Sequence, residues 1–292
     1  MAKLKYGRYI YKRLIKKSVH PEITAPIVSL KPKKETGDTD ISFEWCYISQ
    51  PVIMAKRPAA EDLDRFLVFA GGDPLNLDDF KAEIEISLGE KGDVYKFDEP
   101  RVVYIPRGLV HYPLTIKKVG RPLMMLDITS TQMYPQKKIS DYAKYITAPS
   151  IGTHHDVIKT YHDDKLTKEQ KWSYKELHYS GKEAAGGGLT LGWFPVVEPH
   201  IMHEVPHSHD FDMLALFLGS NPLNVREFDA ELDMWLGEEG EKYSVTSTSA
   251  VYHPKGLIHR QVDFQRIDKP FQEFHVFMAP EHTVIETNPT RK

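Results

Sequence analysis

The chain has 292 residues, and its 38 Lys and Arg residues nearly balance its 41 Asp and Glu residues, for a formal net charge of −3. This balance argues against a nucleic-acid-binding surface over the whole protein. No apolar run approaches the roughly 18 residues that a membrane span needs. The single cysteine, Cys46, excludes an intramolecular disulfide and fits a reducing compartment.

Residues 1–33 form a basic N-terminal arm, which begins MAKLKYGRYIYKRLIKKS. The arm lacks the apolar core of a secretion signal, so we expect a cytoplasmic protein. Tyrosines and isoleucines alternate with the charges. This pattern favours a partly helical arm that packs on another part of the protein over a membrane-surface or nucleic-acid patch.

Residues 34–132 are expected to form a first β domain. Phe80, Ala82, Ile84, Ile86 and Leu88 alternate with charged residues, which is the period-two pattern of a strand with one buried face. Turn-forming stretches such as GGDP separate such strands. Short strands at regular spacing with these turns predict a sandwich or barrel.

Residues 133–180 differ in composition from the first domain and are expected to be a partly helical linker. Two stretches, ISDYAKYITAPS and DKLTKEQKWSYKELHY, are charged and have a weakly helical composition. The glycine-rich stretch AAGGG then leads into a second domain, residues 181–292.

The second domain repeats the first. The stretch FAGGDPLNLDDFKAEIEISLGEKGDVY begins at Phe69, and FLGSNPLNVREFDAELDMWLGEEGEKY begins at Phe217, an offset of 217 − 69 = 148. The same offset pairs Trp45 with Trp193, and YIPRGLVH with YHPKGLIH, without a gap. The chain therefore contains two copies of one domain.

Histidines gather in the second copy. His207 and His209 lie two residues apart, so on a strand they point to the same face. His259 follows a turn fixed by Pro254 and Gly256, which can bring it in from a neighbouring strand. A pair of histidines alone is weak evidence for a metal site, but this combination inside a β repeat is much stronger.

These motifs resemble those of the cupin superfamily. HSH, then an acidic residue and a glycine, is similar to the first cupin motif, and PKGLIH is similar to the second. With the repeat, the resemblance implies a bicupin: an all-β protein of two tandem double-stranded β-helix (jelly-roll) barrels, with a few short helices in the arm and linker. Asp212 departs from the family pattern, because it follows His209 too closely and is not glutamate.

The resemblance and the residues together predict one divalent transition metal per chain, bound by His207, His209 and His259. Fe(II) and Mn(II) are favoured if Asp212 also ligates, and Ni, Cu or Zn suit three imidazoles. Asp212 is alternatively a turn cap or a hydrogen-bond partner of a histidine.

The first copy has Ala59 and Glu61 where the second has His207 and His209, while it keeps Asp64 and His111. We interpret it as a degenerate half. A weaker site from Glu61, Asp64 and His111 is the alternative.

Three further residues are candidates for catalysis: His203, Glu273 and His275. His203 either lines the mouth of the site or lies on the surface. Glu273 and His275 share one face of the strand that begins at Phe271, and Phe274, Val276 and Met278 share the other. The favoured arrangement has the apolar face filling the barrel, with His275 pointing away. In the alternative, a wet cavity uses Glu273 or His275 as acid or base.

The resemblance implies a metal-dependent oxidoreductase of the dioxygenase type that acts on a small oxygenated or aromatic substrate. A sugar isomerase or decarboxylase would use the same ligands. A non-catalytic ligand-binding or regulatory bicupin, or a metal-free structural one, are the alternatives. A small molecule is the expected ligand, a homodimer the expected assembly, and neither nucleic acid nor membrane an expected partner.

Overall fold

The computed structural model describes residues 4–18, 23, 26–31, 39–54, 56–131, 141–154, 157–162, 165–171, 174–182, 187–202 and 205–287. Within these residues the chain is almost entirely β, which confirms the predicted all-β class. Two short 3₁₀ helices fall in the arm and the linker, as expected. No helix in these ranges is long and apolar enough to span a membrane.

The first half contains η1 (Gly7–Tyr9), β1 (Ile10–Tyr11), β2 (Ile15–Lys17), β3 (Pro26–Leu30), β4 (Ser42–Ile48), β5 (Val52–Met54), β6 (Asp64–Gly71), β7 (Ala82–Leu88), β8 (Asp93–Phe97), β9 (Arg101–Ile105), β10 (His111–Val119) and β11 (Leu123–Ser130). The second contains η2 (Tyr142–Tyr145), β12 (Ile146–Thr147), β13 (Ser150–His154), β14 (Val157–His162), β15 (Lys165–Lys171), β16 (Tyr174–Ser180), β17 (Thr190–Val196), β18 (His200–Met202), β19 (His207–Ser208), β20 (Met213–Gly219), β21 (Ala230–Leu236), β22 (Glu241–Val245), β23 (Ser249–His253), β24 (His259–Ile267), β25 (Phe271–Phe277) and β26 (Ile285–Glu286).

Each half is a jelly-roll barrel made of two antiparallel sheets. The first barrel joins a sheet in the order β12-β9-β6-β11-β4-β3-β2 to a sheet in the order β5-β10-β7-β8. The second joins β1-β23-β20-β25-β17-β16-β13 to β22-β21-β24-β19-β26, with β18 beside β24. The strand registers repeat as well: Phe69 pairs with Met125 in the first barrel, as Phe217 pairs with Glu273 in the second.

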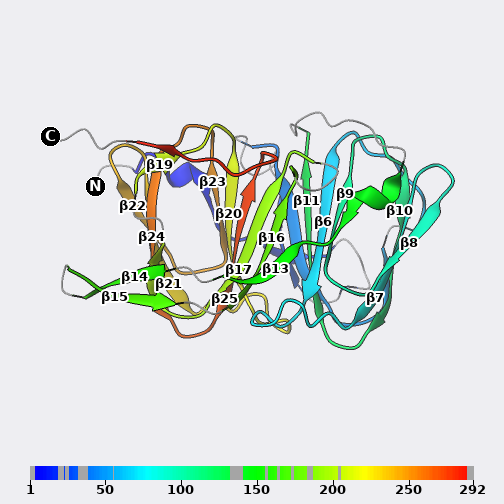
Figure 1. Ribbon diagram of the computed structural model, residues 1–292, viewed down its shortest axis with the longest axis horizontal. Coiled ribbons are helices and arrows are strands. Elements are labelled where there is room, and N and C mark those ends of the chain that lie inside the picture. The colour runs from blue at the N-terminus through cyan, green and yellow to red at the C-terminus, as the bar shows by residue number, and fades with distance from the viewer. Residues whose placement is uncertain are drawn as a thin grey trace.

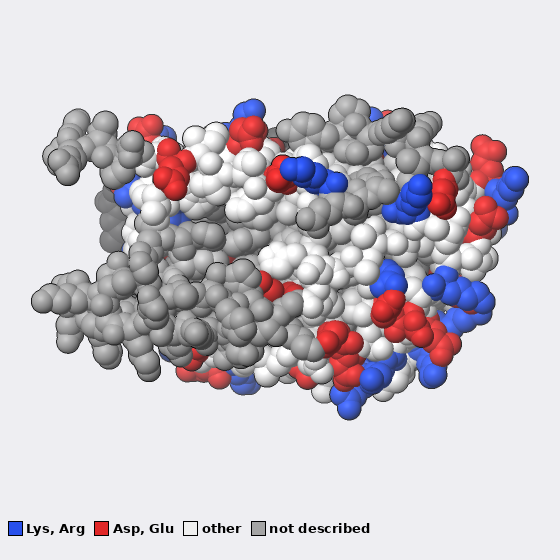
Figure 2. Space-filling view, in the orientation of Figure 1, with Lys and Arg blue, Asp and Glu red and all other residues white. Residues whose placement is uncertain are grey.

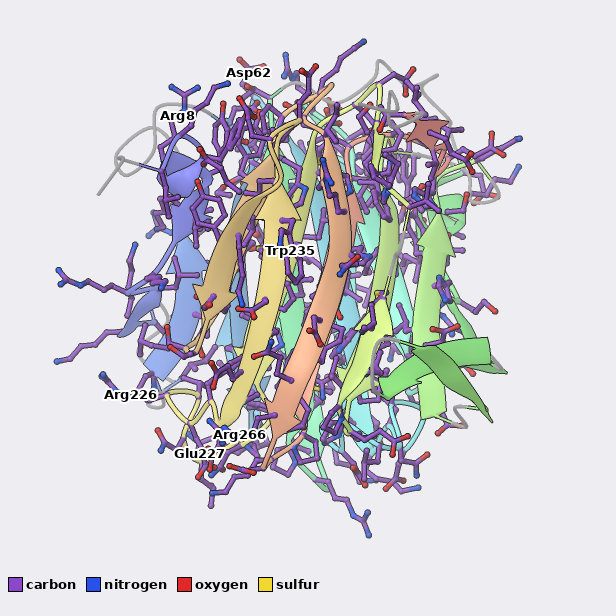
Figure 3. All side chains as sticks on the ribbon, turned by 90° about the vertical axis from the view of Figure 1, so that its left-hand side faces the viewer. Arg8, Asp62, Arg226, Glu227, Trp235 and Arg266 are labelled. Carbon is purple, nitrogen blue, oxygen red and sulfur yellow. The ribbon has the colours of Figure 1, made fainter. Side chains whose placement is uncertain are left out.

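The two barrels lie side by side and share one apolar layer, where their seven-stranded sheets face each other (Figure 1). Trp45 and Phe66 of the first half and Trp193 and Phe274 of the second belong to this layer and are fully buried. Each barrel also has a separate apolar interior. The six-stranded sheet of the second barrel turns its outer face away from the shared layer, and Trp235 lies on that face beside Lys242 (Figure 3).

Each half sends a short segment onto the other barrel. From the N-terminal arm, β1 pairs with β23, and Lys5 forms an ion pair with Glu239. From the linker, β12 pairs with β9, the counterpart of β23 in the first barrel. The arm and the linker are therefore equivalent parts of the duplicated unit, and their exchange ties the halves together. The arm packs on the chain's own second barrel.

The expectation of helix in residues 164–179 is wrong, because this stretch forms β15 and β16. Leu177 and Tyr179 of β16 are buried, and the strand extends the sheet by pairing with β17. Pairing with an existing sheet edge overrides the weak helical propensity of a charged stretch. On the described part of one face, acidic and basic side chains are interspersed (Figure 2).

Removal of one ring from the shared layer should destabilise both halves together. Phe274 is fully buried and stacks on Trp193, with 4.5 Å between the ring centroids. We expect Phe274→Ala to lower the free energy of unfolding by about 3–5 kcal/mol. Denaturant unfolding followed by tryptophan fluorescence and by circular dichroism should show one shared transition at lower denaturant.

The matched control is Leu223→Ala, because Leu223 is 86% exposed. Its effect should stay within about 0.5 kcal/mol. Two separated transitions in the Phe274 variant, with only one of them shifted, would contradict a layer that couples the barrels.

Candidate metal centre

Three buried histidines converge inside the second barrel. His207 opens β19, His259 opens β24, and the two residues pair directly across these strands. His209 follows β19 on the same face. The ring centroids lie 4.2 Å apart for His207 and His259, 5.2 Å for His207 and His209, and 5.1 Å for His209 and His259. One ligand atom of each lies within 4.8 Å of the others, so a single ion could bind all three.

Backbone carbonyls orient the three rings. Nδ1 of His207 lies 3.0 Å from the carbonyl oxygen of Val205, and Nδ1 of His259 lies 3.2 Å from that of Leu257. Nδ1 of His209 lies 2.7 Å from the oxygen of Thr283. These contacts place a proton on each Nδ1 and make Nε2 the lone-pair donor, which is the usual arrangement of metal-binding histidines.

Burial favours the neutral imidazole form of two of the three histidines, and the neutral form is the one that binds a metal. Burial lowers the pKa of His209, and it holds the pKa of His259 well below the ordinary value. The neighbouring histidines lower both further.

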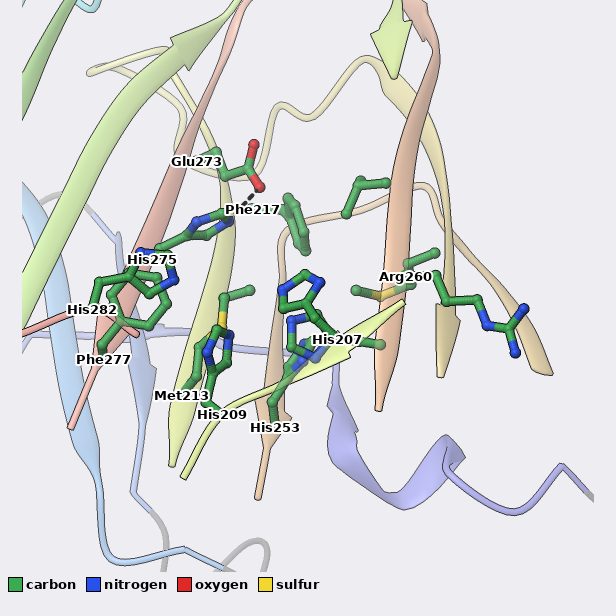
Figure 4. Close-up of a pocket in the computed structure, with 14 residues that line it drawn as sticks. His207, His209, Met213, Phe217, His253, Arg260, Glu273, His275, Phe277 and His282 are labelled. Carbon is green, nitrogen blue, oxygen red and sulfur yellow. Dashed lines mark hydrogen bonds and ion pairs between the residues drawn. The ribbon is translucent and has the colours of Figure 1, made fainter. Parts of the chain in front are cut away.

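The three histidines line a cavity of about 30 Å³ in the second barrel (Figure 4). Its apolar wall includes Met213, Phe217 and Phe277. Arg260 also borders the cavity, but its guanidinium points away from the histidines. The polar wall adds one glutamate and three histidines to the triad: Glu273, His253, His275 and His282. Six histidines and one glutamate therefore share the cavity.

The cavity contains Glu273 and His275, so the orientation favoured from the sequence is wrong. Phe274 and Val276, which were expected to fill the barrel, belong instead to the layer between the two barrels. One face of β25 packs in the apolar layer between the barrels, and its other face lines the cavity of the second barrel. Nε2 of His275 lies 2.9 Å from Oε1 of Glu273. Burial raises the pKa of Glu273 well above its ordinary value and lowers that of His275 to about 4.

Sequence reasoning missed His253 and His282 as cavity residues. His253 is buried, its ring centroid lies 4.5 Å from that of His259, and neither ring nitrogen has a hydrogen-bond partner among the described residues. Burial lowers the pKa of His253 to about 3 and that of His282 to about 4. The repeat held a signal for His253, because the first copy has Ile105 at the equivalent position. His203 lies outside the described residues.

Asp212 does not belong to the group of residues that could hold a metal ion together, and its carboxylate has other partners. Its carboxylate accepts a hydrogen bond from the Tyr252 hydroxyl at 2.9 Å and one from the Lys255 backbone N–H at 2.8 Å. We call this pair of hydrogen bonds the Asp212 clasp. The first half has the equivalent Asp64 clasp, in which the Asp64 carboxylate accepts a hydrogen bond from the Tyr104 hydroxyl at 2.8 Å and one from the Arg107 backbone N–H at 3.1 Å. A contact present in both halves serves the fold, since it anchors the turn that precedes His259 or His111.

The first barrel holds a guanidinium in place of a histidine cluster. Arg65, the counterpart of Met213, forms ion pairs with Glu61 at 2.9 Å and with Asp127 at 3.1 Å. Nε2 of His111 lies 3.7 Å from Glu61. The alternative site from Glu61, Asp64 and His111 does not form, because Asp64 is in the clasp and Glu61 is paired with Arg65. Among the described residues, only the triad of the second barrel forms a group that could hold a metal ion.

Two jelly-roll barrels in tandem, one with a histidine cluster inside, define a bicupin fold. Searches with protein-family models and against curated proteins gave no match. Solved structures do match. AerE from Microcystis aeruginosa is 8% identical, with a TM-score of 0.54 over 92% of this chain and 98% of its own.

Oxalate decarboxylase from Bacillus subtilis is similar to the same extent. A variant of it with one tryptophan changed to phenylalanine is 9% identical, with a TM-score of 0.54 over 93% of this chain and 76% of its own. A further structure of that enzyme, from work on its Mn(II) centres, is 10% identical, with a TM-score of 0.53 over 89% and 74%. At these identities the likeness shows the fold alone: this chain has the cupin fold twice, as predicted.

The Asp212 clasp should support stability without contributing to metal binding. We expect Asp212→Asn and Asp64→Asn each to lower the free energy of unfolding by about 1–3 kcal/mol, since each variant weakens two hydrogen bonds to a carboxylate. Metal content per chain, measured by mass spectrometry, should equal that of the wild type in both. Metal loss in the Asp212 variant alone would restore the ligand interpretation.

The metal-free protein should lose stability on acidification below about pH 6.5. His200, His253, His275 and His282 have folded-state pKa values of about 4, 3, 4 and 4, against 6.5 for an exposed histidine. Protonation therefore favours the unfolded chain. The stability is fully present above pH 6.5 and falls as the pH drops toward 4, by about 1.4 kcal/mol per pH unit for each proton taken up.

Denaturant midpoints between pH 7.5 and pH 4.5 measure this slope. His200→Phe should flatten it, since the ring of His200 already packs on Phe264. His178→Asn is the control, because that side chain is half exposed. A pH-independent midpoint would show that the buried histidines are not neutral in the folded state.

Proposed function

We propose that this protein is a metal-dependent enzyme that acts on a small carboxylate, through one divalent ion bound by His207, His209 and His259. The observation that supports this most strongly is the charge of the cavity. Three neutral imidazoles would leave the full double charge of the ion in a buried space. A bound ion would act as a Lewis acid that polarises the oxygens of its ligand.

The cavity supplies no ionised carboxylate to offset that charge. Asp212 is engaged in its clasp, and burial raises the pKa of Glu273, which favours its protonated form. An anionic substrate that offers two oxygens would both balance the ion and occupy its open positions. Fe(II) and Mn(II) remain the proposed ions, since such a substrate provides the hard oxygen ligands that Asp212 does not.

The size of the cavity limits the size of the substrate that we propose. At about 30 Å³ it has room for roughly two water molecules. A substrate of a few heavy atoms fits this space better than the aromatic one that the sequence suggested. Non-oxidative decarboxylation is therefore the proposed reaction, because it needs no second reactant in the cavity.

A dioxygenase reaction is the second candidate, and the apolar wall of Met213, Phe217 and Phe277 favours it, because O₂ partitions into apolar surroundings. The same wall excludes water and so strengthens electrostatic contacts within the site. A homodimer and a cytoplasmic location are kept as proposals on the resemblance and the composition.

Metal content is the first test. Natively purified protein should hold about one transition metal ion per chain, measured by mass spectrometry. His207→Ala/His209→Ala should hold none. His111→Ala is the matched control, because it removes the equivalent histidine of the barrel that has no cluster, and it should keep the full content. Two ions per chain would contradict a degenerate first half.

Turnover is the second arm of that test. The metal-loaded protein is incubated with a series of two- to four-carbon oxo- and dicarboxylates, and CO₂ release is followed with and without O₂. Release without O₂ supports decarboxylation, and release coupled to O₂ consumption supports the dioxygenase. A protein that binds the ion yet turns over none of them in either condition would be a ligand-binding bicupin, and no bound ion after reconstitution with Fe(II) or Mn(II) would overturn the metal site itself.

A further inference from the structure

The pair formed by Glu273 and His275 has no evident structural purpose. Glu273 is fully buried and His275 is 9% exposed. Oε1 of Glu273 is bonded to His275, and Oε2 has no hydrogen-bond partner among the described residues. The cross-strand neighbours of Glu273 are Phe194 and Phe217. Burial of a carboxyl group among apolar side chains costs free energy when one of its oxygens has no hydrogen-bond partner, so its presence here calls for a functional explanation.

The first barrel shows that the strand does not need this pair. At the equivalent positions of β11 it has Met125 and Asp127, in the same register. Met125 belongs to the apolar interior of the first barrel, and Asp127 pairs with Arg65. The carboxyl–imidazole pair therefore occurs only in the barrel that has the histidine triad, and it lines the same cavity.

The pair lies beside the triad. In Figure 4, His275 lies next to Glu273, and both line the same cavity as His209. His207 is close enough to His275 to lower its pKa further, after burial. No Lys or Arg side chain among the described residues forms an ion pair with Glu273. Burial raises the pKa of Glu273 and lowers that of His275, which favours the neutral forms of both groups.

We propose that His275 is the catalytic proton donor of this site and that Glu273 is the positioning residue that resupplies its proton. The inference rests on the proposed decarboxylation. The bond between the carboxylate carbon and its neighbour breaks, its electron pair stays on the neighbouring carbon, and CO₂ leaves. That carbon takes a proton from the ring nitrogen of His275 that is not bonded to Glu273, and a C–H bond forms.

Nε2 of His275 takes the proton of the Glu273 carboxyl in the same step. Glu273 is left as a carboxylate that accepts a hydrogen bond from Nε2, and water restores its proton when the product leaves. The imidazole only exchanges one neutral tautomer for the other. A relay without an imidazolium suits a buried cavity, where an isolated positive charge beside a metal dication is costly.

The test uses Glu273→Gln, which keeps the shape and an acceptor oxygen but has no acidic proton. The control is Glu273→Met, the residue that the first barrel has at this position. Both variants should keep one metal ion per chain. We expect kcat to fall by about 100-fold or more in both, with KM changed only a few-fold, as for loss of a general acid.

Two readouts report the pair independently of folding. Infrared difference spectra of the metal-free protein should show the band of a protonated carboxyl group, which both Glu273 variants lose. Added imidazole should restore part of the turnover of His275→Ala, as expected if the ring donates a proton and not if it only fills space.

Wild-type kcat in Glu273→Gln, an ionised Glu273 in the infrared spectra, or no imidazole rescue would each overturn this inference while leaving the proposed function in place. A wild-type protein that binds metal but decarboxylates nothing would overturn the proposed function instead, and the proton-donor role with it, even if the infrared band is present.

Discussion

The apolar layer between the two barrels is the constraint on which the rest of the molecule depends. A strand in a jelly roll ordinarily has one face for the barrel interior and one for solvent, so an apolar face would be assigned to the interior. Here β25 presents Phe274 and Val276 to the layer between barrels. Because that face of β25 already packs in an apolar layer, its other face does not have to be apolar. The other face carries Glu273 and His275, which line the cavity of the second barrel. The functional cavity is a consequence of how the halves pack.

The two barrels differ in how the polar groups in their interiors are balanced electrostatically. Both barrels keep a histidine at the start of the same strand, His111 and His259, and both place polar groups around it. The first barrel neutralises its carboxylates with a built-in cation, the guanidinium of Arg65. The second has Met213 at that position, with six histidines and Glu273 around the cavity, and three of these histidines form a group that could hold a metal cation. Gene duplication allows such a division, because one barrel can keep the fold stable while the other keeps a cavity.

Much of the fold and of the candidate site could be predicted from the sequence, and the features that could not be predicted have identifiable physical causes. The repeat and the period-two patterns predicted tandem β barrels, and the spacing of His207, His209 and His259 predicted which histidines converge, since these signals are local. The side of β25 that faces the cavity depends on packing between barrels, which strand parity alone does not contain. The same holds for residues 164–179, whose strands are stabilised by pairing with a distant edge.

Asp212 shows a different limit of prediction from the sequence, because a motif position does not by itself define a residue's role. Its place in the motif suggests a ligand, yet Asp64 occupies the same place in a barrel without the histidine pair, where it clasps Tyr104. A comparison of the two copies within the sequence held part of the answer: Asp64 and Asp212 are shared by the halves and make the same contacts in both, whereas the cavity residues His253 and Glu273 replace Ile105 and Met125 of the first copy. A metal ion bound by His207, His209 and His259 would have no carboxylate among these three ligands. In the proposed function, the anionic substrate supplies the negative charge that this ligand set lacks.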